Sequence, residues 1–178
     1  MGLSDAGVLK CYAGCSFAAV MDALRGGPMP SVPRVIRSYS EKLVSLYNYT
    51  DAEGTVIAEK GRFETSDGHK TFKWRMPGSE SWSGLNGMSM ADVPLYGVAK
   101  LGQQPHAPVY YVEGEKACEA CWNGGLLAVT HGGGAGVKDC GSRLEVLRDR
   151  MVYLWADNDA PGTAYMARVK AKLTLLGC

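Results

Sequence analysis

The length, composition and charge of this chain are those of an ordinary globular protein. Its 178 residues suffice for one domain with an appendage or for two small domains. With a net charge of +1, the protein has no overall positive potential that would attract nucleic acid, so such binding must come from a local basic patch. No apolar segment is long enough to span a bilayer, and the N-terminus lacks the basic-then-apolar order of a signal peptide. We therefore expect a cytoplasmic protein.

The first predicted element is a helix preceded by two cysteines. Cys11 and Cys15 stand just before a helical pattern that covers residues 17–24. Several prolines follow and make residues 26–33 a poor interior for a helix or strand. We predict a small N-terminal segment, residues 1–27, that is joined to the rest of the chain by a linker.

The middle of the chain is predicted to be a meander of short antiparallel strands. Strand-forming residues occupy 47–50 and 55–58, with a turn between them, and two further runs occupy 62–65 and 70–75. We expect these strands to form a small α+β lobe, residues 28–107, ahead of the second half of the chain.

This lobe carries the clearest basic patch of the sequence. In the strand predicted at 70–75, Phe72 and Trp74 fall on one face and the intervening cations on the other. Cations beside aromatic rings suit single-stranded nucleic acid, in which each stacked base contributes roughly 1 to 3 kcal/mol. A hairpin with an aromatic core face and a solvated face has the same pattern, so both interpretations stay open. The candidate nucleic-acid contacts are Arg62, Lys70, Lys73 and Arg75, with Lys60 in the same patch.

Two apolar runs in the second half of the chain end abruptly in carboxylates. The run 109–112 is followed by Glu113, and the run 152–156 is followed by Asp157 and Asp159. Each run suits a strand buried on both faces, and a helical pattern follows each. Ligands of open α/β sheets bind beyond the carboxyl ends of the strands, so these acids point into one crevice if their strands are neighbours.

Such a group of acids predicts a metal site. Carboxylates crowded together repel one another unless protons or a cation neutralise them. Hard oxygen ligands without a nearby His or Cys favour Mg²⁺ over zinc. The structural alternative is that all three are solvated acids at strand ends.

A Cys-x-x-Cys pair, Cys118 and Cys121, invites a zinc or redox interpretation. Both cysteines fall inside the amphipathic helix predicted after Glu113, where packing of small apolar side chains on the sheet is the preferred interpretation. Without an export signal, reduced thiols are the default state for the six cysteines of the chain.

Two candidate phosphate contacts accompany the acids. Lys116 stands on the first turn of the predicted helix and is either a phosphate contact or a surface lysine. A glycine-rich segment follows the apolar run 126–129, and its backbone N–H groups could approach a phosphate closely. A tight structural turn is an equal alternative. The candidates in this segment are Gly133, Gly134 and Lys138.

The paired strand ends resemble the Toprim family, the metal-binding domain of bacterial-type DNA primases, type II and IA topoisomerases and some nucleases. That family has a strand ending in Glu-Gly and a later strand ending in Asp-x-Asp, which Glu113-Gly114 and Asp157-Asn158-Asp159 match. The resemblance implies an α/β fold in which a Toprim-like Rossmannoid parallel sheet with flanking helices, residues 108–178, follows the α+β lobe with its antiparallel strands. Ala117 departs from primase-like members, which usually carry an acid there.

The function that the resemblance implies is metal-assisted phosphoryl transfer. Asp157 and Asp159 hold one or two Mg²⁺ or Mn²⁺ ions, with Glu113 as a ligand or general acid/base. The leading expectation is a DNA primase of a phage, plasmid or other mobile element. It makes RNA primers from ribonucleoside triphosphates on a single-stranded DNA template in the bacterial or phage-infected host cytoplasm, with a replicative helicase as a partner and no membrane. A Toprim nuclease or repair factor and a non-catalytic nucleic-acid-binding fragment are the alternatives.

The N-terminal cysteines carry a second resemblance. Residues 8–16 and the helix after them are similar to the second half of the zinc ribbon in phage and plasmid primases. Such ribbons need four ligands for a closed tetrahedral site, and the other two lie upstream in the family. We therefore expect Cys11 and Cys15 to be a ribbon remnant that does not bind Zn²⁺.

Overall fold

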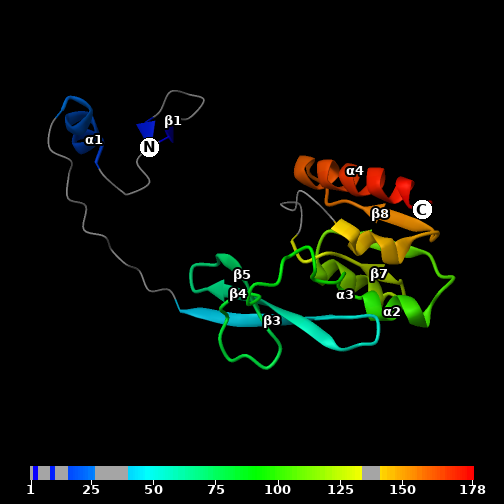
Figure 1. Ribbon diagram of the computed structural model, residues 1–178. Coiled ribbons are helices and arrows are strands. Elements are labelled where there is room, and N and C mark those ends of the chain that lie inside the picture. Colours follow the sequence, from blue (N-terminus) through cyan, green and yellow to red (C-terminus); the bar gives the residue numbers. More distant parts are fainter. Residues whose placement is uncertain (1, 4–8, 11–15, 27–39, 134–140) are drawn as a thin grey trace. The chain divides into compact units, whose positions relative to one another are not determined.

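The structure, a computed structural model, describes residues 2–3, 9–10, 16–26, 40–133 and 141–178 (Figure 1). The chain divides into two compact units, residues 1–39 and 40–178. The further boundary near residue 107 stays a prediction from sequence.

The N-terminal unit contains a short hairpin and one helix. Strands β1 (Gly2–Leu3) and β2 (Leu9–Lys10) pair in antiparallel fashion. Helix α1 (Phe17–Leu24) has the predicted bounds, and the side chain of Ser16 caps it by accepting a 3.3 Å hydrogen bond from the Ala19 N–H. Cys11 and Cys15 lie outside the described residues, so their predicted lack of zinc stays a prediction.

The second unit begins with the predicted antiparallel meander. Its strands are β3 (Glu41–Thr50), β4 (Val56–Thr65) and β5 (Lys70–Arg75), in the order β3-β4-β5. The prediction of separate strands at 55–58 and 62–65 was wrong, because β4 runs unbroken through both. Gly61 stands at the middle of β4, where a Cβ would lie 2.6 Å from the Trp82 ring. A glycine here lets the strand continue beneath that ring.

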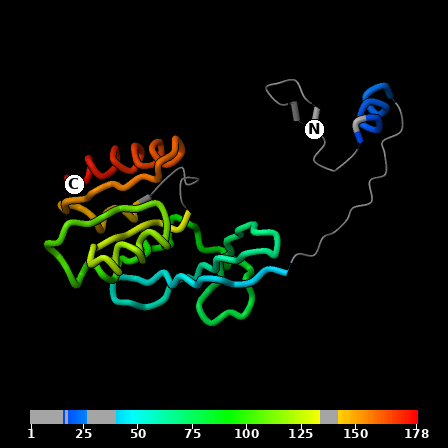
Figure 2. The backbone as a smooth tube through the Cα atoms, turned by 180° about the vertical axis from the view of Figure 1, so that it is seen from behind, coloured from blue at the N-terminus to red at the C-terminus, as the bar shows by residue number. Residues whose placement is uncertain are grey.

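A parallel sheet of three strands follows, so the predicted α/β class is confirmed. The strands β6 (Val109–Val112), β7 (Ala128–Val129) and β8 (Val152–Trp155) are in the order β7-β6-β8. Figure 2 shows their arrangement from behind. The accompanying helical elements are α2 (Val98–Gln103), α3 (Glu115–Asn123), the 3-10 helix η2 (Gly141–Leu147) and α4 (Ala160–Leu175).

Different elements cover the two faces of the parallel sheet. On one face Tyr111 and Val129 pack in a core that includes Tyr165 and Val169 of α4. On the other face Val112 and Ala128 pack in a core with residues of α3 and of the antiparallel sheet. The shared second core holds the two sheets of this unit together.

Strand β8 lies at the edge of the sheet, which corrects the prediction that it is buried on both faces. Tyr153 is 49% exposed and Trp155 is 57% exposed. The reason is that α3 contacts β6 and β7, whereas α4 contacts β8 from the opposite face. The face of β8 toward α3 is therefore left open.

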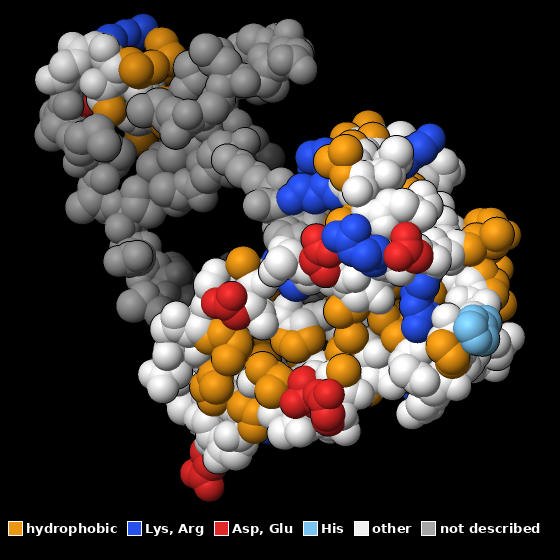
Figure 3. Space-filling view, turned by 45° about the vertical axis from the view of Figure 1, so that its right-hand side comes forward, with side chains coloured by type: hydrophobic (Ala, Val, Ile, Leu, Met, Phe, Trp, Pro, Cys, Tyr) orange, Lys and Arg blue, Asp and Glu red, His pale blue; other side chains and the backbone are white. Residues whose placement is uncertain are grey.

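Hydrophobic side chains are also exposed elsewhere in this unit. Figure 3 shows them in orange, interspersed with charged side chains. No helix in the described part of the chain combines the length and apolar character needed to cross a membrane.

Candidate functional site

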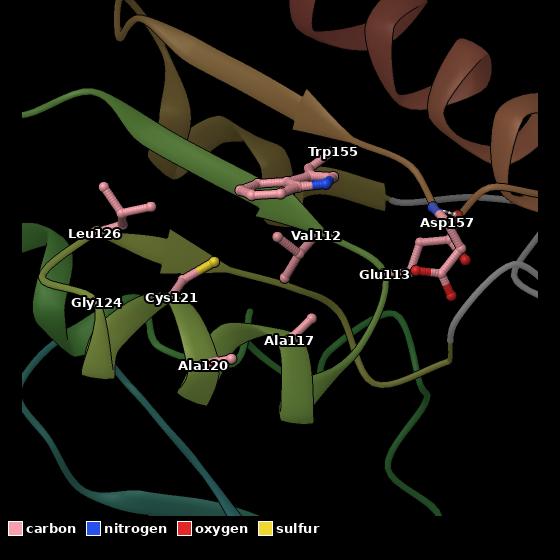
Figure 4. A pocket seen from close by; sticks show the side chains of 9 residues that line it. All are labelled: Val112, Glu113, Ala117, Ala120, Cys121, Gly124, Leu126, Trp155 and Asp157. Atoms are coloured by element: carbon pink, nitrogen blue, oxygen red, sulfur yellow. Dashed lines mark hydrogen bonds between the residues drawn. The ribbon is translucent and has the colours of Figure 1, made fainter.

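The acidic ends of β6 and β8 lie side by side. The two strands pair in parallel, with Val112 opposite Trp155. Directly beyond them, the backbone N–H of Asp157 donates a 3.1 Å hydrogen bond to Oε1 of Glu113. Figure 4 shows these two acids together at one end of a pocket. The fold thus brings together the two motifs that the sequence singled out.

Asp159 begins the helix that follows β8. It is the N-cap of α4, and its Oδ1 accepts a 2.7 Å hydrogen bond from the Gly162 N–H. Pro161 in the first turn suits this position because the N–H that it lacks has no partner within a helix. Sequence reasoning missed this capping role, although an Asp shortly before a proline is a signal of a helix start.

Gly162 allows the Glu113 carboxylate to approach the start of α4. A Cβ on Gly162 would lie 2.1 Å from Oε1 of Glu113 and 3.0 Å from Oδ1 of Asp159. These two carboxylates are therefore neighbours. The N-terminus of a helix favours negative charge, because its N–H groups point outward and its dipole is positive there.

The chemistry of this donor set fits a hard divalent cation. Glu113, Asp157 and Asp159 offer carboxylate oxygens, which Mg²⁺ and Mn²⁺ prefer. Within residues 40–133 and 141–178, however, no three His, Cys, Asp or Glu side chains form a group that could hold a metal as they stand. A shared ion therefore requires side-chain rotation, for which the exposed Asp157 has room.

Glu113 also lines a second cavity, of about 410 Å³, which we call the acid–aromatic cleft. One wall comes from β4 and β5, and the other comes from the ends of β6 and β7. Phe72 is half-exposed, and Nζ of Lys60 lies 4.7 Å from the centroid of its ring. A nucleobase could stack only on the part of the ring that Lys60 leaves open. The cleft is lined by Lys60, Phe72, Trp74, Glu113, Gly114, Glu115, Gly132 and Gly133.

A buried ion pair joins the two walls of this cleft. Nζ of Lys60 lies 2.6 Å from Oε1 of Glu115 and donates a 2.7 Å hydrogen bond to the carbonyl of Gly132. The Tyr49 hydroxyl donates to the same oxygen of Glu115. Burial, reinforced by the charge of Glu115, raises the pKa of Tyr49, so the hydroxyl keeps its proton. Lys60 is thus part of the cleft wall and not of a solvated patch.

Most of the predicted nucleic-acid contacts have carboxylate partners inside the lobe. Their pairs are Arg62 with Glu64, Lys73 with Glu41 and Arg75 with Glu59. Lys70 is exposed. The predicted alternation is confirmed for Phe72 and Trp74, which line the cleft. The paired carboxylates reduce the positive charge of the patch. The aromatic rings that line the cleft are therefore better candidates for nucleic-acid contacts than the cations are.

The comparisons with known proteins add no family or fold relative. Neither the protein-family models, nor the curated proteins, nor the solved structures gave a match. The functional argument therefore rests on the residues and their arrangement.

The remaining candidates differ in how the structure places them. Lys116 is exposed on the first turn of α3, and Gly133 lines the acid–aromatic cleft. Gly134 and Lys138 lie outside the described residues. Lys116 therefore keeps both of its interpretations, as a phosphate contact and as a surface lysine.

The Cys-x-x-Cys pair is part of the packing of α3. Cys118 is fully buried in the second core, and burial raises the pKa of its thiol, which opposes the thiolate form that a metal needs. Cys121 is half-buried and packs against the same core. The packing interpretation is confirmed.

If Glu113, Asp157 and Asp159 bind Mn²⁺ as the sequence predicts, replacing Gly162 with alanine is expected to weaken that binding by roughly 10–100-fold, the usual effect of disturbing the support of a metal ligand. The new methyl group would displace the Glu113 carboxylate from its position. Because the Glu113 side chain is flexible, it can move aside, and the fold should stay intact. Calorimetric titration with Mn²⁺ measures the change. Gly102→Ala is the matched control, because a Cβ there meets nothing within 4 Å. Equal Mn²⁺ affinity in both variants would contradict the expectation.

Proposed function

We propose that this protein is a DNA primase-type nucleotidyltransferase, which makes short RNA primers from ribonucleoside triphosphates on single-stranded DNA. In this proposal it serves the replication of a phage, plasmid or other mobile element and works beside a replicative helicase in the bacterial or host cytoplasm. The observation that carries the proposal is the hydrogen bond between Asp157 and Glu113, which joins the acidic ends of adjacent parallel strands. That edge of the sheet is where α/β proteins bind ligands.

The reaction joins a ribose 3′-hydroxyl to the α-phosphorus of the incoming triphosphate. A new P–O bond forms, and the bond to the departing pyrophosphate breaks. Asp157 and Asp159 would hold Mg²⁺, which would neutralise charge on the attacking and leaving oxygens. Glu113 would accept the proton of the attacking hydroxyl or, if it completes the ligand set instead, that proton would pass to water.

The acid–aromatic cleft supplies the place for the template strand. Phe72 offers a half-exposed ring to a base, and Glu113 stands in the same cavity. Backbone groups of Gly132 and Gly133 line it without side chains that exclude a strand. A base stacked on Phe72 would therefore share the cavity with Glu113.

A non-catalytic role in nucleic-acid binding is the second candidate. One observation favours it: within residues 40–133 and 141–178, no three His, Cys, Asp or Glu side chains form a group that could hold a metal as they stand. A Toprim nuclease uses the same acids with water as the attacking group.

The test is incorporation of labelled ribonucleotides on single-stranded DNA with Mg²⁺ or Mn²⁺. The double variant Asp157→Asn/Asp159→Asn is expected to lose product by roughly 100-fold. Asparagine caps a helix as well as aspartate does, so α4 should stay folded. Glu53→Gln/Glu80→Gln, at two exposed acids, is the control for the same change of charge.

Each other outcome points elsewhere. Equal synthesis by the wild type and the Asp157→Asn/Asp159→Asn variant would place the activity away from these acids. Shortening of the DNA by the wild type would indicate a nuclease. DNA binding without either product would favour the non-catalytic role.

A further inference from the structure

A pocket between α3 and β8 differs in character from the acid–aromatic cleft. Its volume is about 270 Å³, and apolar side chains form most of its surface. Trp155 and the small residues of α3 enclose it, and Glu113 and Asp157 stand at one end (Figure 4). We call this pocket the Trp155 slot.

The floor of the slot is one face of α3. The residues that form it are three or four positions apart, a spacing that places side chains on one face of a helix, and all of them are small. At 1.5 Å of rise per residue they form a trough about 10 Å long. The floor residues are Ala117, Ala120, Cys121 and Gly124.

The opposite wall is the indole of Trp155. It is 57% exposed because α3 leaves this face of β8 uncovered. The Tyr110 ring supports it at a centroid distance of 6.2 Å. An indole that stands over a shallow apolar trough presents a flat face on which a planar ring can stack.

The acids at the end of the slot restrict what can occupy it. A wholly apolar ligand would bring Glu113 and Asp157 out of water without a partner, which is unfavourable. A planar ring attached to a polar, cation-binding group suits both the apolar slot and its acidic end. The ring stacks in the slot, and the polar group reaches the acids. A nucleotide has this construction, with a base at one end and phosphates that bind divalent cations at the other.

We propose that the Trp155 slot binds the nucleobase of the nucleotide whose phosphates reach Glu113 and Asp157 through a divalent cation. This inference rests on the proposed function, since it names where the substrate base lies. Glu113 lines both the slot and the acid–aromatic cleft. A nucleotide in the slot and a strand in the cleft therefore meet at the same carboxylate.

The first test follows the indole N–H signal of Trp155 in a nitrogen–proton NMR spectrum, assigned with Trp155→Phe. Adenosine without metal is expected to shift this signal in a saturable way. Ala120→Leu should suppress the shift, because Ala120 is exposed and a larger side chain there fills the slot without entering the core. Ala52→Leu, at an exposed alanine outside the slot, should leave it unchanged. No shift, or an equal shift in Ala120→Leu, overturns the proposal.

The second test separates the base from the phosphates. Calorimetry compares ATP with tripolyphosphate, both with Mn²⁺, and Ala120→Leu is expected to weaken ATP binding about tenfold, or 1.4 kcal/mol, without changing tripolyphosphate binding. Equal weakening of both ligands overturns the slot. If tripolyphosphate fails to bind while adenosine still shifts Trp155, the proposed function fails and the slot stands.

The same NMR signal distinguishes the two sources of a base. ATP and a short single-stranded oligonucleotide are titrated separately into the protein. A saturable shift with ATP that Ala120→Leu suppresses supports the nucleotide as the occupant. A shift with the oligonucleotide alone overturns that assignment and makes the slot part of the strand-binding surface.

Discussion

Replacing Lys60 with methionine is expected to lower the free energy of unfolding by about 3–5 kcal/mol, because it leaves a buried charge without its partner. Lys60 and Glu115 are both buried, and their side chains form an ion pair. The carbonyl of Gly132 would lose its donor as well. Methionine keeps most of the apolar stem of lysine, so the loss reports on the charge and its hydrogen bonds.

Urea unfolding measures this effect, with Lys42→Met as the control at an exposed lysine on β3. The double variant Lys60→Met/Glu115→Gln should recover part of the stability, since the neutral amide no longer needs a cation. If Lys60→Met unfolds like the control, the buried pair does not hold the two sheets together.

Acid is expected to destabilise the protein through His131 between about pH 6.5 and pH 4. This side chain is 1% exposed, and burial, assisted by the charges of Arg143 and Lys60, lowers its pKa to about 4, whereas Glu115 acts in the opposite direction. In the unfolded chain the pKa is about 6.5, so the unfolded state binds the proton first as the pH falls. The contribution is complete above pH 6.5, and about 3 kcal/mol is lost by pH 4.

The hydrogen bonds of His131 agree with a neutral ring. Its Nδ1 accepts from the Gly133 N–H at 3.4 Å, and its Nε2 lies 3.2 Å from the Tyr165 hydroxyl. Unfolding free energies from pH 7.5 to pH 4.5 measure the effect in wild type, in His131→Gln and in the exposed control His69→Gln. His131→Gln should show the weaker pH dependence. Parallel profiles for all three would rule out His131 as the titrating group.

Local sequence patterns gave the bounds of some elements but not which elements lie next to one another. The apolar run of β6 and the helical pattern of α1 gave the observed bounds, because each pattern reflects burial along one short segment. The same reasoning failed for β8, since a four-residue apolar run looks alike in a central strand and in an edge strand. Trp155 is exposed because β8 is the edge strand of the sheet, and a local pattern does not indicate the order of the strands.

The site was predictable where it depends on the ends of strands. The adjacency of Glu113 and Asp157 follows from the rule that parallel strands end at one edge of a sheet. The pair between Lys60 and Glu115 joins residues 55 positions apart, and both look like solvated charges in the sequence. Nothing in their local patterns connects them.

Because Glu113 lines both cavities, the ligands proposed for them would be coupled wherever one of them fixes the position of this side chain. A ligand that fixes the rotamer of this carboxylate in the Trp155 slot also sets the wall of the acid–aromatic cleft. Thermodynamic linkage makes the effect reciprocal: whatever factor the first ligand contributes to the affinity of the second, the second returns to the first. Under the proposed function, this one side chain would make the binding of the nucleotide and of the template strand cooperative.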